Sequence, residues 1–84
     1  MKNDIPLIDL PISVEAEIVE LRGGRGFQSR LRSLGLVEGQ QIKKLSRAGL
    51  GGPVIVLINR TQVAIGCGMA SRIIVRSSGG DQRG

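Results

Sequence analysis

Glycine is the feature that most limits what this chain can fold into: thirteen of its 84 residues are Gly and three more are Pro. Gly adopts positive φ without a steric penalty, and both residues favour tight turns. Such a content is too high for a helical bundle of this length, because Gly and Pro weaken helix interiors. A chain this short builds one compact core at most. The sequence therefore predicts a single, mostly β domain of short strands joined by tight turns.

The run from Val54 to Ile58 is the strongest strand signal, because its five residues are all β-branched or aliphatic. A continuous apolar run suits a strand covered on both faces, so we expect it to be central in the sheet. Asn59-Arg60 then forms a two-residue turn, since Asn tolerates positive φ. Residues 61–65 return antiparallel, with side chains that alternate between inward and outward.

Shorter apolar segments predict the remaining strands. They are Glu15 to Leu21, Gln41 to Leu45 and Ile73 to Val75, with Ile5 to Leu10 as an edge strand or an extended arm that caps the core. Pro6 and Pro11 keep that last segment out of the middle of a sheet, because Pro lacks the N–H of a ladder. In the first of these strands, Leu21 is expected on the face opposite Ile18. Five or six short antiparallel strands at this spacing favour a small, nearly closed β-barrel.

One helix is expected after Gly23-Gly24, where the apolar period changes from about 2 to about 3.6. Phe27, Leu31 and Leu34 form one stripe of that helix, at positions i, i+4 and i+7. Gly35 can end the helix in the left-handed conformation, and the residue after it packs back on the last turn. The pattern predicts an α-helix over about residues 26–34 that packs on the sheet. Residues 69–72 are expected to form one further helical turn at most.

The boundaries of the domain follow from composition. Residues 1–76 are expected to form the single domain, and residues 77–84 a disordered C-terminal tail, because they contain no apolar residue. No apolar run approaches the roughly 20 residues of a membrane-spanning helix, and no basic stretch leads into an apolar one as in a secretory signal. The lone Cys67 excludes an internal disulfide. These features predict a cytoplasmic protein.

The net charge of +5 is unevenly distributed along the chain. Residues 1–21 carry five acidic side chains and one basic, whereas residues 22–76 carry ten basic side chains and one acid. A block this one-sided favours an acidic protein surface, a nucleic acid or an anionic lipid as partner. The alternative is a solvated basic surface that serves solubility. The candidate partner-binding residues are Arg25, Arg30, Arg32 and Arg47.

Groups that perform chemistry are almost absent from the sequence. There is no His, which removes the commonest general base and the commonest metal ligand. Cys67 alone falls far short of the usual four zinc ligands, and no His is present to activate it as a nucleophile. The Gly-rich stretches at 23–26 and 49–52 match neither common phosphate-binding motif. The sequence therefore predicts no catalytic residue, no cofactor and no metal site, in a protein that is not an enzyme and acts by binding.

A nucleic-acid-binding barrel is the main alternative function. The basic charge suits contacts with phosphates, but single-strand binders usually present several aromatic rings on the sheet. Phe27 is the only aromatic residue, and it falls on the buried stripe of the predicted helix. The sequence therefore does not favour nucleic acid as the partner. A second alternative is a stand-alone interaction module whose barrel edge recruits a peptide strand, and the same edge would allow a homodimer.

Short motifs follow one another in a distinctive order along the chain. They are Ala16-x-Ile18-Val19-x-Leu21, Gly23-Gly24, Arg30-Leu31-x-x-Leu34-Gly35-Leu36, Gly39-x-x-Ile42, Gly52-Pro53-Val54-x-Val56, Val63-Ala64-Ile65 and Ala70-x-x-Ile73-x-Val75. With this order and spacing, residues 5–76 resemble the ferrous iron transport protein A (FeoA) family. The resemblance implies an SH3-like β-barrel with a helical insertion.

The resemblance also implies a function. FeoA proteins are accessories of FeoB, the membrane ferrous iron transporter with a GTP-binding domain, and are thought to act by protein contact without a dedicated iron site. Two loops depart from the family pattern: Gly51-Gly52-Pro53 replaces Gly-Asp-Pro, and residues 66–70 replace a segment with a Glu-Ala pair. Family contacts at these loops do not transfer to this chain. The same domain also occurs fused to metal-dependent repressors.

Overall fold

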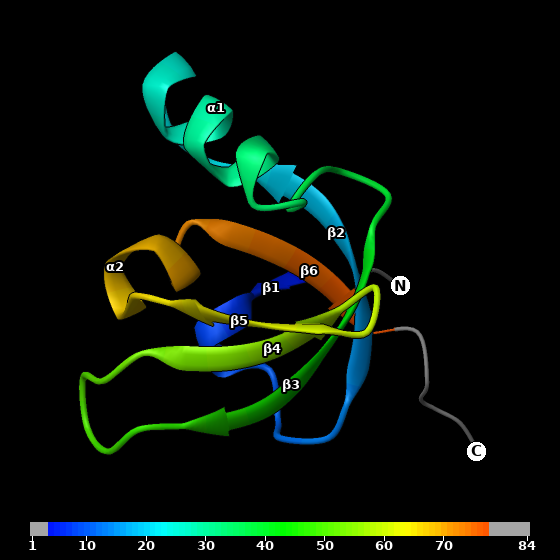
Figure 1. Cartoon of the computed structure of the whole chain (residues 1–84), viewed down its shortest axis with the longest axis vertical. Helices are drawn as coiled ribbons and strands as arrows, with labels where there is room; N and C mark the ends of the chain where they lie inside the picture. The colour runs from blue at the N-terminus through cyan, green and yellow to red at the C-terminus, as the bar shows by residue number, and fades with distance from the viewer. Residues whose placement is uncertain (1–3, 78–84) are drawn as a thin grey trace.

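The computed structural model describes residues 4–77 (Figure 1). Its elements in chain order are β1 (Asp4–Pro6), η1 (Leu7–Asp9), β2 (Glu15–Leu21), α1 (Arg25–Ser33), β3 (Gln41–Arg47), β4 (Val54–Ile58), β5 (Thr61–Ile65), α2 (Cys67–Ala70) and β6 (Ile73–Ser77). The six strands form one antiparallel sheet in the order β1-β6-β2-β3-β4-β5, which curves around a single core. The predicted mostly β, SH3-like barrel with one inserted helix is confirmed.

The predicted C-terminal tail begins at residue 77, which is the last residue that the structure describes. β6 extends to Ser77, and the remaining residues of the predicted tail, 78–84, lie outside the described residues. Between residues 4 and 77, neither α-helix has the length and apolar character needed to cross a bilayer.

The β4–β5 hairpin has the predicted form. β4 is an interior strand between β3 and β5, but it is second from the edge and not in the middle of the sheet as predicted. Its alternate residues Val54, Val56 and Ile58 are buried and the two between them are only half-buried, so the strand is not fully covered on both faces. Ile58 pairs with Thr61 across the turn, whose two residues Asn59 and Arg60 have φ of 50° and 66°. Two successive residues at positive φ are typical of a type I′ turn, whose twist matches that of the flanking strands.

The first strand lies at one edge of the sheet, as predicted for a segment that contains Pro6. Among the strands of residues 4–77, β1 pairs with β6 alone, and the chain then turns away through η1. Leu7 and Leu10 are almost fully buried, at 0% and 1% exposure. The expectation that this segment caps the core is therefore confirmed.

A β-bulge changes the alternation in β2. The register with β6 shifts between Ile18 and Glu20, so that Val19 is an extra residue in β2. Leu21 therefore returns to the core side and is 3% exposed. The prediction that Leu21 lies on the face opposite Ile18 is wrong, because it assumed an unbroken period of two and a bulge reverses that alternation.

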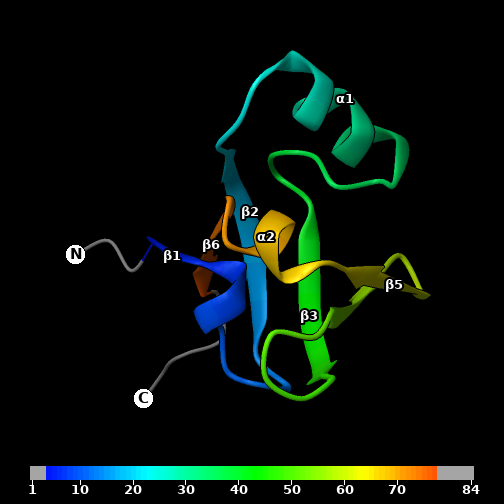
Figure 2. The ribbon, with the colours of Figure 1, turned by 90° about the vertical axis from the view of Figure 1, so that its left-hand side faces the viewer.

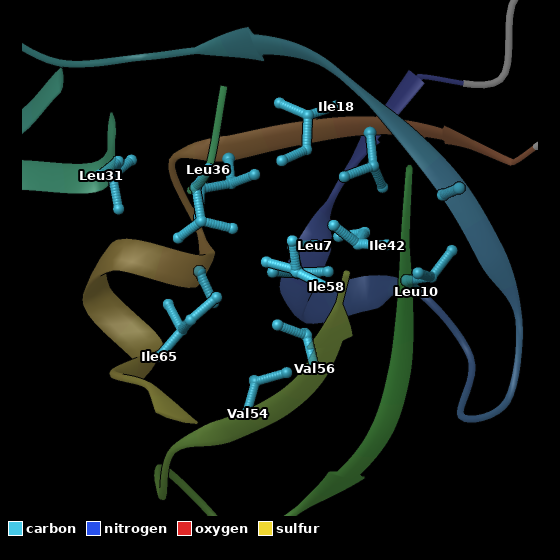
Figure 3. Close-up of a cluster of buried hydrophobic side chains, with 14 of the residues drawn as sticks. Leu7, Leu10, Ile18, Leu31, Leu36, Ile42, Val54, Val56, Ile58 and Ile65 are labelled. Carbon is cyan, nitrogen blue, oxygen red and sulfur yellow. The ribbon is translucent and has the colours of Figure 1, made fainter. Parts of the chain in front are cut away.

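The core is almost entirely aliphatic. Its buried members are Leu7, Leu10, Ala16, Ile18, Leu21, Leu31, Leu36, Ile42, Val54, Val56, Ile58, Ile65, Ala70, Ile73 and Val75. Figure 3 shows Leu7 and Leu10 pointing into the same space as Ile42 and Val56 from the sheet. Burying one Leu, Ile or Val side chain contributes about 1.5–3 kcal/mol, so this cluster stabilises the fold without a disulfide.

α1 begins and ends one residue earlier than predicted. Gly35 has φ of 88°, its N–H donates to the carbonyl of Arg32 at 2.9 Å, and the N–H of Leu36 donates to the carbonyl of Leu31 at 2.9 Å. These two bonds are those of a Schellman motif, and both leucines are fully buried. Leu34 is 41% exposed, so its expected place on the buried stripe is wrong. The helix has ended before this residue, and Leu34 serves as its cap.

The second helical turn is also shifted. α2 spans Cys67–Ala70, two residues before the predicted turn, and its last residue Ala70 is buried in the core.

Replacing the second turn residue should stabilise the protein. Arg60 has φ of 66°, where a side chain with a Cβ is strained. We expect Arg60→Gly to raise the free energy of unfolding by about 0.5–1 kcal/mol, because Gly is favoured at this place in a type I′ turn. Urea denaturation followed by far-UV circular dichroism measures the change. An unchanged or lower stability would contradict the assigned turn.

Candidate partner-binding surface

α1 stands at one end of the barrel, above β3 and β5 in both views (Figures 1 and 2). Only Leu31 of this helix is fully buried, and Phe27 and Gln28 are half-buried. Arg25, Arg30 and Arg32 are all exposed. The structure therefore presents three of the four predicted partner-binding residues on one helix that projects from the barrel.

Two side chains of the first helical turns fix α1 to the sheet. The amide of Gln28 donates to the carbonyls of Leu21 at 3.1 Å and Gly23 at 3.2 Å. The Phe27 ring lies where a Cβ on Gly23 would stand, so the ring packs directly on the backbone. On the ring, the guanidinium of Arg72 lies 5.5 Å from the centroid, within the range of a cation–π contact.

The end of the molecule around α1 carries an excess of positive charge. We call α1 together with Arg22 and Arg72 the α1 end, because the N–H of Arg22 donates to the carbonyl of Arg72 at 2.8 Å. Arg22 pairs with Glu20 at 3.3 Å, and Arg32 lies 4.0 Å from Glu38. Within residues 4–77, no ion pair involves Arg25, Arg30 or Arg72.

Arg47 is placed elsewhere. It is the last residue of β3, where it pairs with Val54, and the loop that follows lies at the end of the molecule opposite α1 (Figures 1 and 2). The structure thus brings together Arg25, Arg30 and Arg32 and separates Arg47 from them.

Lys44 is a charged residue that the sequence analysis did not single out. It is 4% exposed, on the same side of β3 as Ile42, and its Nζ donates to the carbonyl of Ile8 at 2.9 Å. Burial and the nearby charge of Arg47 lower the pKa of the Lys44 ammonium, and the charge of Asp9 partly offsets this. Its position two residues after Ile42 in a strand was the sequence signal that could have indicated that Lys44 points inward. Lys44 ties the N-terminal segment to the barrel.

The outer face of the sheet has a hollow of about 400 Å³. Its lining residues are Glu15, Gln41, Ile42, Lys43, Leu57, Asn59 and Arg60. They include no Ser, Thr, Cys or His side chain. Among residues 4–77, no three His, Cys, Asp or Glu side chains lie close enough together to hold a metal ion. Cys67 is a half-buried free thiol.

The fold and this surface define a class of protein: a small SH3-like barrel with one inserted helix that carries a basic, exposed surface. The FeoA domain family matches residues 5–77, and the chain therefore belongs to the FeoA family. Membership in this family indicates involvement in ferrous iron transport.

Solved structures agree with this assignment. A crystal structure of an iron uptake regulatory protein (FeoA) is 30% identical, with a TM-score of 0.82 over 90% of this chain and 99% of that chain. FeoA from Chlorobium tepidum is 32% identical, with a TM-score of 0.81 over 98% of this chain and 74% of that chain. The manganese regulator SloR shares the fold at 12% identity, with a TM-score of 0.79 over 88% of this chain and 34% of that chain. No curated protein matches the sequence.

The contact between Phe27 and Gly23 can be tested with two similar substitutions. A Cβ at Gly23 would collide with the Phe27 ring, whereas nothing lies within 4 Å of a Cβ at Gly26. We expect Gly23→Ala to lower the free energy of unfolding by about 1–3 kcal/mol. Gly26→Ala should raise it by up to about 1 kcal/mol, because Ala is the better helix former. Urea denaturation of both variants gives the comparison, and equal effects would contradict the packing of α1 described above.

The lowered pKa of Lys44 should make the stability of the folded protein depend on pH in the alkaline range. The unfolded chain holds the lysine proton more tightly than the folded protein, whose Lys44 pKa is lowered from 10.5. Raising the pH from that lowered pKa toward 10.5 should therefore stabilise the folded protein. We expect the unfolding free energy of the wild type to rise over this range relative to Lys44→Met. Lys43→Met, on the neighbouring and more exposed residue, should keep the wild-type slope. Parallel profiles for the wild type and Lys44→Met would exclude this role.

Proposed function

We propose that this protein is a non-catalytic accessory of ferrous iron uptake that binds the cytoplasmic GTP-binding part of the FeoB transporter and modulates it. The observation that carries the proposal is the match of the FeoA domain family to residues 5–77. The likeness to a protein described as an iron uptake regulatory protein supports it. The proposed location is the cytoplasm, at the inner face of the membrane through the partner.

The exposed arginines provide a physical basis for such binding. Arg25 and Arg30 form no ion pair within residues 4–77, so an acidic partner surface would not have to displace an existing bridge. Charges of this kind accelerate encounter and suppress wrong partners more than they add to affinity. We therefore propose that α1, with Arg25, Arg30 and Arg32, forms the main docking surface. Arg47 lies away from this helix and would contact only a partner that extends along the whole barrel.

A binding titration tests the proposed function directly. The full chain would be titrated with the purified cytoplasmic GTP-binding domain of the transporter, at low and at physiological salt, by isothermal titration calorimetry. We expect saturable binding that weakens as salt increases, because the contacts are between exposed charges. A folded protein that shows no binding at low salt would remove the proposal.

Charge reversal should locate the docking surface. We expect the double variant Arg25→Glu, Arg30→Glu to weaken binding about threefold to tenfold, with a slower association rate and a smaller salt dependence. Arg47→Glu reverses one charge at the opposite end of the molecule, where the double variant reverses two, and should have less than half of the double variant's effect on the binding free energy. Surface plasmon resonance measures both rates. An effect of Arg47→Glu larger than that of the double variant would place the docking surface away from α1.

A further inference from the structure

The two edges of the sheet are built differently. β1 has three residues, contains Pro6, and holds Asp4 in an ion pair with Arg76 at 2.8 Å. Short length, proline and charge are the means by which proteins protect a sheet edge from further pairing. β5 has five residues, Thr61–Ile65, with no charge and no proline. It also pairs with β4 in an unbroken register. β5 is therefore the unprotected edge.

The register identifies which backbone groups of β5 face outward. The two-residue turn makes Ile58 and Thr61 a hydrogen-bonded pair, and such pairs alternate along an antiparallel ladder. Gln62 and Ala64 fall at the positions between them, so their N–H and C=O groups point away from β4. No other strand of the described chain pairs with this side of β5. Two residues with outward-facing donors and acceptors at this spacing match the backbone of an extended chain.

The side chains along this edge leave it accessible. Gln62 and Ala64 are exposed, and Val63 between them is half-buried against the core. None of these residues carries a charge that would repel an approaching strand. Adding one strand would also cover the exposed part of Val63.

The free edge of β5 lies on the side of the barrel from which α1 projects. In both views α1 lies above β5, and in Figure 1 β4 lies below β5, so the side of β5 away from β4 is turned toward the α1 end (Figures 1 and 2). Arg25 and Arg30, which form no ion pair in the described chain, lie at that end. Arg60 is exposed in the turn at the start of β5. A segment paired with β5 would therefore lie in a region of positive potential.

We propose that β5 accepts an extended, acidic segment of the partner protein as an additional antiparallel or parallel strand, held by the backbone of Gln62 and Ala64. The inference rests on the proposed function, since it specifies how the partner's cytoplasmic domain is bound. Charge selects this occupant over a second copy of the chain, because a second copy would bring another net charge of +5 to the same place.

Two measurements on the complex with the transporter's cytoplasmic domain test this inference. Amide hydrogen exchange by NMR should show new protection at Gln62 and Ala64 when the partner is added. Ala64→Pro should weaken binding about tenfold, because it removes an outward N–H, whereas Ala64→Val keeps that N–H and should bind within about twofold of the wild type. The proline removes no bond to β4, and a ¹H–¹⁵N spectrum checks that the variant is folded.

The outcomes separate this inference from the proposed function. Binding without new protection at Gln62 and Ala64 would overturn the strand addition and leave the accessory function standing. Protection that rises with the concentration of this chain alone would show that a second copy occupies the edge, which also overturns it. No binding by the wild type would remove both proposals together. Exchange on the wild type decides the matter where Ala64→Pro does not fold.

Discussion

Burial of aliphatic side chains inside a curved antiparallel sheet is the interaction on which the whole structure depends. The chain has one aromatic residue and one cysteine, so a disulfide is excluded, and the single ring, Phe27, packs at the edge of the core and is only half-buried. Small branched side chains fill the interior, and the N-terminal segment adds Leu7 and Leu10 to the same cluster. The same core positions α1, because Leu31 and Leu36 at the end of that helix are buried in it. The helix that carries the exposed arginines is thus held on the barrel by side chains that belong to the same core.

The fold was predictable wherever local sequence determines the structure. β4, its turn and β5 follow from a continuous aliphatic run, a two-residue turn and strict alternation, and each involves neighbouring residues only. The bulge at Val19 was not predictable, because it depends on how β2 aligns with β6, a strand distant in sequence. Lys44 shows the same limit. Its spacing from Ile42 indicates the inward face, but the carbonyl of Ile8 that accepts its hydrogen bond comes from a distant segment.

The candidate site was predictable only in part, for a geometric reason. Arg25, Arg30 and Arg32 lie within one short helix, so sequence proximity keeps them together in space. Arg47 is the last residue of β3, a strand of seven residues, and a strand of that length carries the chain about 20 Å at 3.3 Å per residue. Positive charge that is continuous in the sequence is therefore divided between two ends of the molecule. The open edge at β5 was anticipated only in general terms, because identifying an edge strand requires the order of strands in the sheet.

Charge and backbone edge would contribute different things to the proposed complex. Exposed arginines act over a distance of about 8 Å at physiological salt, so they attract an acidic surface without fixing its orientation. Backbone hydrogen bonds act only at contact, but their spacing fixes the direction and register of a bound strand. Side-chain charge alone would make a weak and poorly oriented partner site, and an uncharged edge alone would pair with any extended chain. A barrel that places both on one side can be selective without a pocket, a metal or a catalytic group.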